Sequence, residues 1–147
     1  MERTSVTQMI FVNLPVADLA RSKSFYAALG FVNEPRFTNE QAACMVLSDA
    51  IFVMLLTHDF WKTFTSKAIP EAKASAQVML AVSRDGKEAV DAMVGAAAAS
   101  GGKADCNPKQ DLGFMYGRSF EDPDGHIWEP NWMDMQAALD RAPATDR

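Results

Sequence analysis

The chain has 147 residues, of which 48% are hydrophobic and 22% charged, and its formal net charge is −5. This length favours a single domain with a substantial core, and the composition excludes a disordered chain. Lysine and arginine are scattered without a basic stripe, which argues against nucleic acid or a membrane surface as a partner and favours small neutral or cationic ligands. The longest apolar run, residues 51–56, is too short to span a membrane. Residues 1–8 lack the hydrophobic stretch of a signal peptide, so we expect a cytoplasmic protein.

The first half of the sequence predicts a strand, a helix and three further strands. Residues 8–16 are β-rich, and Asp18 stands at the N-cap position of a helix that ends near Leu29, before the stop residue Gly30. The three β-rich segments that follow are residues 31–37, 42–47 and 50–57. The predicted order is βαβββ, in a module of about residues 6–58.

A connecting segment of about residues 59–75, with a helix-like pattern in its first part, precedes the second half. A strand at residues 77–83 is followed by a helix through Ala99, for which Asp85 and Glu88 form a predicted capping pair. The predicted buried stripe of this helix is Val90, Met93, Val94 and Ala97.

Three more strands complete the second module, which covers about residues 76–134. They are expected near residues 103–107, 114–120 and 126–133, and a tail of residues 135–147 follows, frayed after Arg141. Residues 12–16 and 78–82 share a V-x-L-x-V pattern, so an internal duplication within one domain of residues 1–147 is the better account of the two similar halves.

The last predicted strand carries an isolated carboxylate, Glu129. A tight turn with the composition Asp-Pro-Asp-Gly, residues 122–125, starts the strand. Alternation then places Glu129 on one face with Ile127, Asn131 and Met133. Among apolar neighbours, a carboxylate must pair, bind a cation or face a wet cavity, because an unpaired buried charge is costly. A solvated strand position is the ordinary alternative.

Two motifs resemble those of a known superfamily. The pattern V-x-D-L-x-x-S-x-x-F-Y-x-x-L-G is matched over residues 16–30, and D-P-D-G-x-x-x-E over residues 122–129. Together they resemble the glyoxalase/bleomycin-resistance/extradiol-dioxygenase, or vicinal oxygen chelate, superfamily, and most closely its lactoylglutathione-lyase-like members. The resemblance implies an α+β fold in which two βαβββ modules form a cupped mixed sheet around a cavity.

Metal-using members of that superfamily place one ligand on the first strand and one on the last strand of each module. The matching positions here are Phe11, Leu55, Gln77 and Glu129. Two of the four cannot bind a cation, and a divalent metal generally needs three or more protein ligands. His58 and His126 fall on the opposite strand faces, so they are expected to be structural. We therefore expect no cofactor; the alternative is Zn, Ni or Fe held by Gln77 and Glu129.

The cavity face is expected to be apolar, with a few polar anchors. The predicted ligand-binding residues are Phe11, Asn13, Leu55, Gln77, Met79, Tyr116, Arg118, Glu129 and Asn131. Three functions remain open on this basis. The first is a metal-independent small-molecule binding protein of the bleomycin-resistance kind. The second is a metal-dependent lyase of the glyoxalase type or an extradiol-type dioxygenase, in which Glu129 acts as ligand or base. The third is a metal-free enzyme with Glu129 as a proton shuttle.

A homodimer is also expected, because cups in this superfamily commonly pair across subunits. The aromatic residues Trp61, Phe64, Trp128 and Trp132 would supply surface to bury in that interface.

Overall fold

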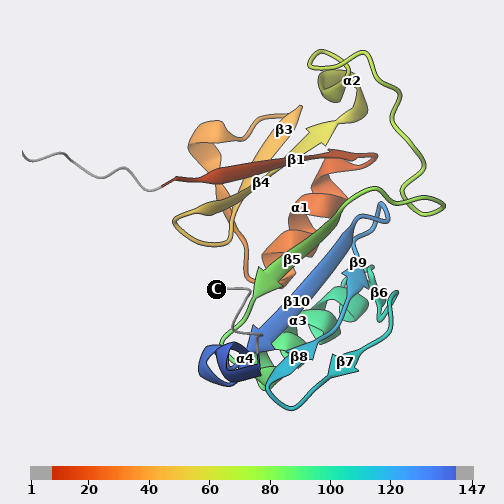
Figure 1. Ribbon diagram of the computed structural model, residues 1–147. Coiled ribbons are helices and arrows are strands. Elements are labelled where there is room, and N and C mark those ends of the chain that lie inside the picture. Colours follow the sequence, from red (N-terminus) through yellow and green to blue (C-terminus); the bar gives the residue numbers. More distant parts are fainter. Residues whose placement is uncertain (1–7, 142–147) are drawn as a thin grey trace, which may run out of the picture. The chain divides into compact units, whose positions relative to one another are not determined.

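A computed structural model describes residues 8–141 of the chain (Figure 1). It divides into two compact units, Met1–Pro70 and Glu71–Arg147, and each is described here by itself. Within the described residues, no helix has both the length and the apolar character needed to cross a membrane. The end of the predicted tail, residues 142–147, lies outside the described part.

The first unit has the predicted βαβββ order. Its elements are β1 (Ile10–Val16), α1 (Leu19–Ala28), β2 (Val32–Glu34), β3 (Ala42–Val46), β4 (Ile51–Thr57) and a final short helix, α2 (His58–Trp61). The four strands form one sheet in the order β1-β4-β3-β2, in which β1 pairs with β4 in parallel and the other pairs are antiparallel.

Local sequence explains where α1 begins and ends. The Asp18 side chain accepts a hydrogen bond from the Arg21 backbone N–H at 3.0 Å, which satisfies one of the free donors of the first turn. Gly30 has φ +101, the left-handed conformation that ends many helices. Between these points α1 buries Phe25 and Tyr26 and packs against β3 and β4 (Figure 1).

The predicted strand at residues 31–37 is wrong in its second half. Pro35 begins a 3-10 helix, Pro35–Phe37, and the Glu34 carboxylate accepts a hydrogen bond from the Arg36 backbone N–H at 3.0 Å. Proline fixes φ near the helical value and has no N–H to give to a strand neighbour, so the strand ends at Glu34.

The second unit repeats the plan with more strands. Its elements are β5 (Met79–Ser83), α3 (Lys87–Ala99), β6 (Lys103–Ala104), β7 (Gln110–Asp111), β8 (Met115–Gly117), β9 (Phe120–Glu121), β10 (Ile127–Met133) and α4 (Met135–Arg141). The sheet order is β6-β9-β10-β8-β7, and β5 pairs with β10 in parallel. The helix α3 packs against β10, and its buried residues are the predicted stripe Val90, Met93, Val94 and Ala97.

Three local features of this unit differ from the prediction. The N-cap of α3 is Gly86, which makes no side-chain capping bond, so the predicted capping pair of Asp85 and Glu88 is wrong. The strand expected over residues 103–107 ends early, because Asp105 takes the left-handed φ of +54. The strand expected over residues 114–120 is two strands, β8 and β9, interrupted at Arg118 and Ser119, and β7 was not predicted.

The turn before β10 is as tight as its composition predicts. One oxygen of the buried Asp122 carboxylate accepts hydrogen bonds from the backbone N–H groups of Asp124, Gly125 and His126 at 2.9–3.0 Å. Gly125 has φ +105, and a Cβ atom there would lie 2.7 Å from the backbone nitrogen of Lys73. Only glycine fits both constraints. The first part of the tail, for which no element was predicted, forms α4, whose N-terminus is capped by the Asp134 side chain.

Candidate functional site

One face of the second unit's sheet carries a pocket of about 420 Å³. The parallel register pairs Glu129 with Ala81 and Ile127 with Met79, so these residues point to the same side of the sheet. The pocket is lined by Ala81, Asn107, Pro108, Gln110, Met115, Gly117, Arg118, Ser119, Glu129, Pro130, Asn131 and Met133. Three of the predicted site residues, Arg118, Glu129 and Asn131, therefore line one cavity.

Glu129 lies in the middle of β10 and is half-buried. Within the described part of the second unit, its carboxylate has one side-chain hydrogen bond, a long one of 3.5 Å from Asn107 Nδ2. Glu129 takes part in no ion pair among the described residues. A half-buried carboxylate with one weak partner is open to a ligand that donates hydrogen bonds.

A neighbouring loop positions Asn107 beside Glu129. The Ser119 hydroxyl accepts a hydrogen bond from the Asn107 backbone N–H at 2.8 Å and donates to the Asn107 carbonyl at 3.2 Å. Ser119 is buried, so these two bonds are shielded from water. The Asn107 side chain is thereby directed to Glu129 and to Met79, whose sulfur lies 3.6 Å from Nδ2.

Two predicted anchors, Tyr116 and Arg118, are bound to other protein groups. The Tyr116 hydroxyl donates to Asp91 Oδ1 of α3 at 2.6 Å, and the ring is buried. Asp91 and Asp105 bind the Arg118 guanidinium. The hydrogen bond from Tyr116, followed by that from Arg118, lowers the pKa of Asp91, and Arg118 lowers the pKa of Asp105. Tyr116 therefore faces the helix, and Arg118 lines the pocket with its charge already paired.

Gln77 does not lie in the strand predicted for it. It occupies an exposed bend two residues before β5 and is not among the residues that line the Glu129 pocket. Met79, the first residue of β5, lies on the Glu129 face and contacts Asn107.

The first unit places Leu55 on the opposite face from the one predicted. Leu55 is 0% exposed and pairs with the buried Leu14, which marks the side covered by α1. Shifting a strand assignment by one residue exchanges the two faces of the sheet. Aligning the V-x-L-x-V frames makes Pro15 the counterpart of Ala81, and Pro15 pairs with Leu56. Leu56, and not Leu55, is thus the first unit's counterpart of Glu129.

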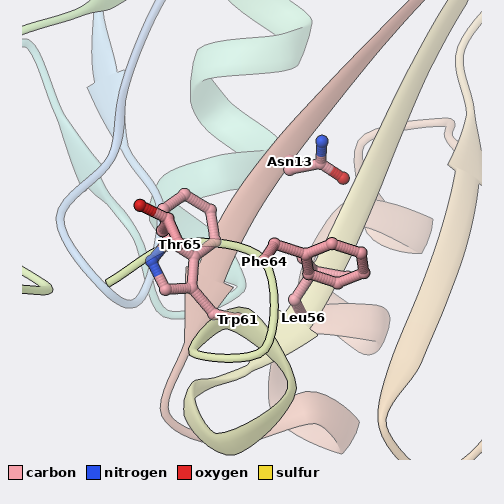
Figure 2. Close-up of a pocket in the computed structure, with 5 residues that line it drawn as sticks. All are labelled: Asn13, Leu56, Trp61, Phe64 and Thr65. Atoms are coloured by element: carbon pink, nitrogen blue, oxygen red, sulfur yellow. The ribbon is translucent and has the colours of Figure 1, made fainter. Parts of the chain in front are cut away.

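A smaller hollow of about 160 Å³ lies over Leu56. Figure 2 shows its lining, in which Trp61, Phe64 and Thr65 come from α2 and the segment after it, and Asn13 comes from β1. The predicted anchor Asn13 thus lines a pocket with an apolar floor. Phe11, on the same face of β1, is 48% exposed and its ring stacks on Phe52 at 4.6 Å.

The donor set does not fit a divalent metal. At the four superfamily positions, the first unit offers Phe11 and Leu56, neither of which can ligate, and the second offers an exposed Gln77 and Glu129. Among residues 8–141, no three His, Cys, Asp or Glu side chains come together as a possible metal site. One carboxylate and one distant amide are too few for a catalytic metal, which is usually held by three protein ligands.

Sequence reasoning missed Asn107, Gln110, Met115 and Ser119 in the pocket wall. For Asn107 and Gln110 the available signal was the turn-rich composition of residues 105–113, which predicts a loop but not the side of the sheet over which it folds.

Comparison with known proteins supports the fold. Residues 8–48 match the family model described as bleomycin resistance protein-like N-terminal. No curated protein matches the sequence significantly.

Many solved structures are similar to this chain. A hypothetical protein from S. aureus aligns with a TM-score of 0.71 at 23% identity, covering 87% of this chain and 95% of that one. A glyoxalase/bleomycin resistance protein/dioxygenase family enzyme from Burkholderia phytofirmans aligns with a TM-score of 0.70 at 18% identity, covering 86% and 99%. A fosfomycin resistance protein from Mesorhizobium loti aligns with a TM-score of 0.61 at 16% identity, covering 94% and 99%. Most of the chain thus shares the fold of these proteins.

Proposed function

We propose that this chain, whose residues 8–48 match a bleomycin resistance protein-like model and whose fold is that of glyoxalase/bleomycin resistance/dioxygenase (vicinal oxygen chelate) proteins, is a member of that superfamily and binds a small organic molecule without a divalent metal. The observation that carries this proposal is the 420 Å³ pocket around Glu129. Its walls combine methionine and proline side chains with a carboxylate and carboxamides, the mixture typical of small-molecule sites.

The metal-dependent alternatives, a glyoxalase-type lyase or an extradiol-type dioxygenase, need a different donor set. Both would use Gln77 and Glu129, yet Gln77 lies in an exposed bend ahead of β5. Metal analysis of the purified protein tests this point directly. We expect no stoichiometric Zn, Ni or Fe, and a tightly bound equivalent of any of them would overturn the metal-independent proposal.

The central test is the substitution Glu129→Gln. We expect the melting temperature to stay close to that of the wild type, because the carboxylate has only a long hydrogen bond from Asn107 to lose. Binding of small amines and alcohols found in a melting-shift screen should weaken by about 1.5–3 kcal/mol, since charged hydrogen bonds contribute that much.

Glu40→Gln provides the matched control. Glu40 is exposed and lies in the first unit, so this variant has the same change in net charge without touching the pocket. It should behave like the wild type in both measurements. A large loss of stability in Glu129→Gln without any change in ligand binding would make Glu129 a structural residue and contradict the proposal.

We also propose that the protein acts as a homodimer. The supporting observation is a group of exposed apolar side chains at the start of β1, where Ile10, Phe11 and the preceding Met9 are about half exposed. Contiguous apolar surface of this kind is commonly buried against another chain.

A further inference from the structure

Glu129 sets the sign of the unpaired charge in its pocket, because Arg118, the one basic lining residue, is already held in ion pairs. Arg118 Nε and one terminal nitrogen donate to the two oxygens of Asp105 at 3.0 and 2.7 Å, and the other terminal nitrogen donates to Asp91 at 2.9 Å. Its side chain is only 20% exposed, so these bonds are partly shielded from solvent. One cation shared between two carboxylates leaves that cluster with a net charge of −1.

Glu129 adds a second negative charge that no basic side chain in the described part of the unit pairs with. The other basic residues in the described part of this unit, among them Arg84, Lys87 and Lys109, are not part of the pocket lining. Lys87 pairs with Asp111, and Lys109 lies over the Tyr116 ring. Among the charged residues that line the pocket, Arg118 is paired and Glu129 is not, so the unpaired charge of the lining is negative.

The carboxamides next to Glu129 present acceptors to the pocket. The Asn107 amide nitrogen is used on Met79 and Glu129. The Asn131 amide nitrogen is used on the backbone oxygens of Val82 and Glu129, at 3.4 and 3.2 Å. Among the described residues, neither side-chain carbonyl oxygen has a recorded hydrogen bond, so both are available beside the carboxylate to a group that donates.

We propose that this pocket selects a small organic cation, a protonated amine on an apolar body, with the ammonium group at Glu129 and the apolar part against Met115 and Met133. This inference rests on the proposed function and specifies its ligand class. An ammonium group has three donors and no acceptor, which matches a carboxylate flanked by two carbonyl oxygens. Anionic ligands should bind most weakly, because Glu129 repels them and the Arg118 guanidinium is already engaged by Asp91 and Asp105.

The experiment compares three probes of nearly equal size and different charge: 2-phenylethylamine, 2-phenylethanol and phenylacetate. Each is titrated into the full chain while backbone amide resonances are followed by NMR, in low salt and in 150 mM salt. We expect 2-phenylethylamine to shift the amides of Asn107, Ser119 and Glu129, and to bind roughly ten- to a hundredfold more tightly than 2-phenylethanol. Phenylacetate should bind most weakly, and the amine preference should fall as salt is added.

Two variants report on the charges themselves. Glu129→Gln should reduce binding of the amine to the level of the alcohol, whereas Glu40→Gln should leave all three affinities unchanged. Asp91→Asn removes one of the two carboxylates that hold Arg118. It should therefore reduce the difference in affinity between 2-phenylethylamine and phenylacetate.

The outcomes separate this inference from the function on which it rests. If 2-phenylethanol or phenylacetate binds at the same amides as tightly as the amine, the cation inference is overturned and small-molecule binding stands. If no probe shifts the amides of the pocket, both the inference and the proposed binding function are contradicted.

Discussion

Arg118 joins three parts of the second unit, two through its guanidinium group and one through its backbone N–H. It contacts Asp91 of α3 and Asp105 after β6, and its own backbone N–H donates to Pro130 of β10 at 3.1 Å. Tyr116 extends the network by donating to Asp91. The hydrogen bond to Asp91 raises the pKa of the Tyr116 hydroxyl, and the two carboxylates raise that of Arg118.

The stability of this network should depend on pH at both ends of the scale. Folding lowers the pKa values of Asp91 and Asp105 from 3.8. Their contribution to the free energy of unfolding is therefore present above about pH 4 and is lost as pH falls through the lowered values. The pKa of Tyr116 is raised from 10, so its contribution is present below about pH 10 and is lost as pH rises through the raised value.

Asp91→Asn tests the acidic limit by urea unfolding. At pH 7 we expect this variant to be less stable than the wild type by roughly 0.5–1 kcal/mol, a small value because the Asp91 side chain is half exposed and its ion pair is screened. The difference should shrink at pH 3, because below 3.8 the Asp91 carboxylate of the unfolded wild-type chain is protonated, and this reduces the advantage of the ionised, paired form in the folded chain. A difference that stays the same from pH 7 to pH 3 would contradict the charge-based account.

At the residue scale, sequence was informative where chemistry is local in the chain. Glu129 stood out because it follows a recognisable turn and is isolated among apolar strand residues. Asn107 did not, because its role depends on Ser119, twelve positions away, and on a loop that folds over the sheet. Leu55 was assigned to the wrong face because a continuous apolar run, residues 51–56, contains no alternation that fixes the strand register.

Among the elements, the two long helices begin in different ways. Asp18 caps α1 through a side-chain hydrogen bond, whereas the N-cap of α3 is Gly86, and Asp85 makes no capping bond. Both segments have an aspartate just before the helix in the sequence, so composition alone did not distinguish them. The ends of β2 and β6 were not predicted either, because they depend on Pro35 in one unit and on the left-handed conformation of Asp105 in the other.

The substitutions Asp18→Ala and Asp85→Ala form a matched pair that tests this difference. Asp18→Ala should lower the free energy of unfolding by about 0.5–2 kcal/mol, the usual effect of losing an N-cap side chain. Asp85→Ala should change it by less than about 0.5 kcal/mol, because Asp85 is exposed and makes no cap. Chemical denaturation of both variants measures the effects, and equal losses would contradict the assignment of the caps.

At the scale of the whole molecule, the fold was largely predictable. Two motifs, residues 16–30 and 122–129, and the repeated V-x-L-x-V frame led to the two βαβββ modules, and the similarity to solved structures confirms the fold. The extra strand β7 and the split between β8 and β9 were not predictable, because each of these strands has only two or three residues. Such short segments carry too little periodicity to be recognised.

The homodimer is best tested by light scattering coupled to size exclusion. We expect a mass of twice 16.1 kDa. Phe11→Ser should shift the distribution toward the monomer, since it removes an exposed aromatic ring from β1. A wild-type chain that remains a monomer at high concentration would contradict the dimer, and a dimer unaffected by Phe11→Ser would place the interface elsewhere.

The equivalent strand positions of the two units hold different residues, Leu56 and Glu129, and this difference has a consequence for binding stoichiometry. Two similar modules could each hold an equivalent site, but the first has an apolar floor under Trp61 where the second has a carboxylate. A cationic ligand would therefore find one such anchor among residues 8–141 of each chain. A single chain should saturate with one equivalent and give a simple hyperbolic isotherm, so any cooperativity in binding would have to arise between chains rather than within one.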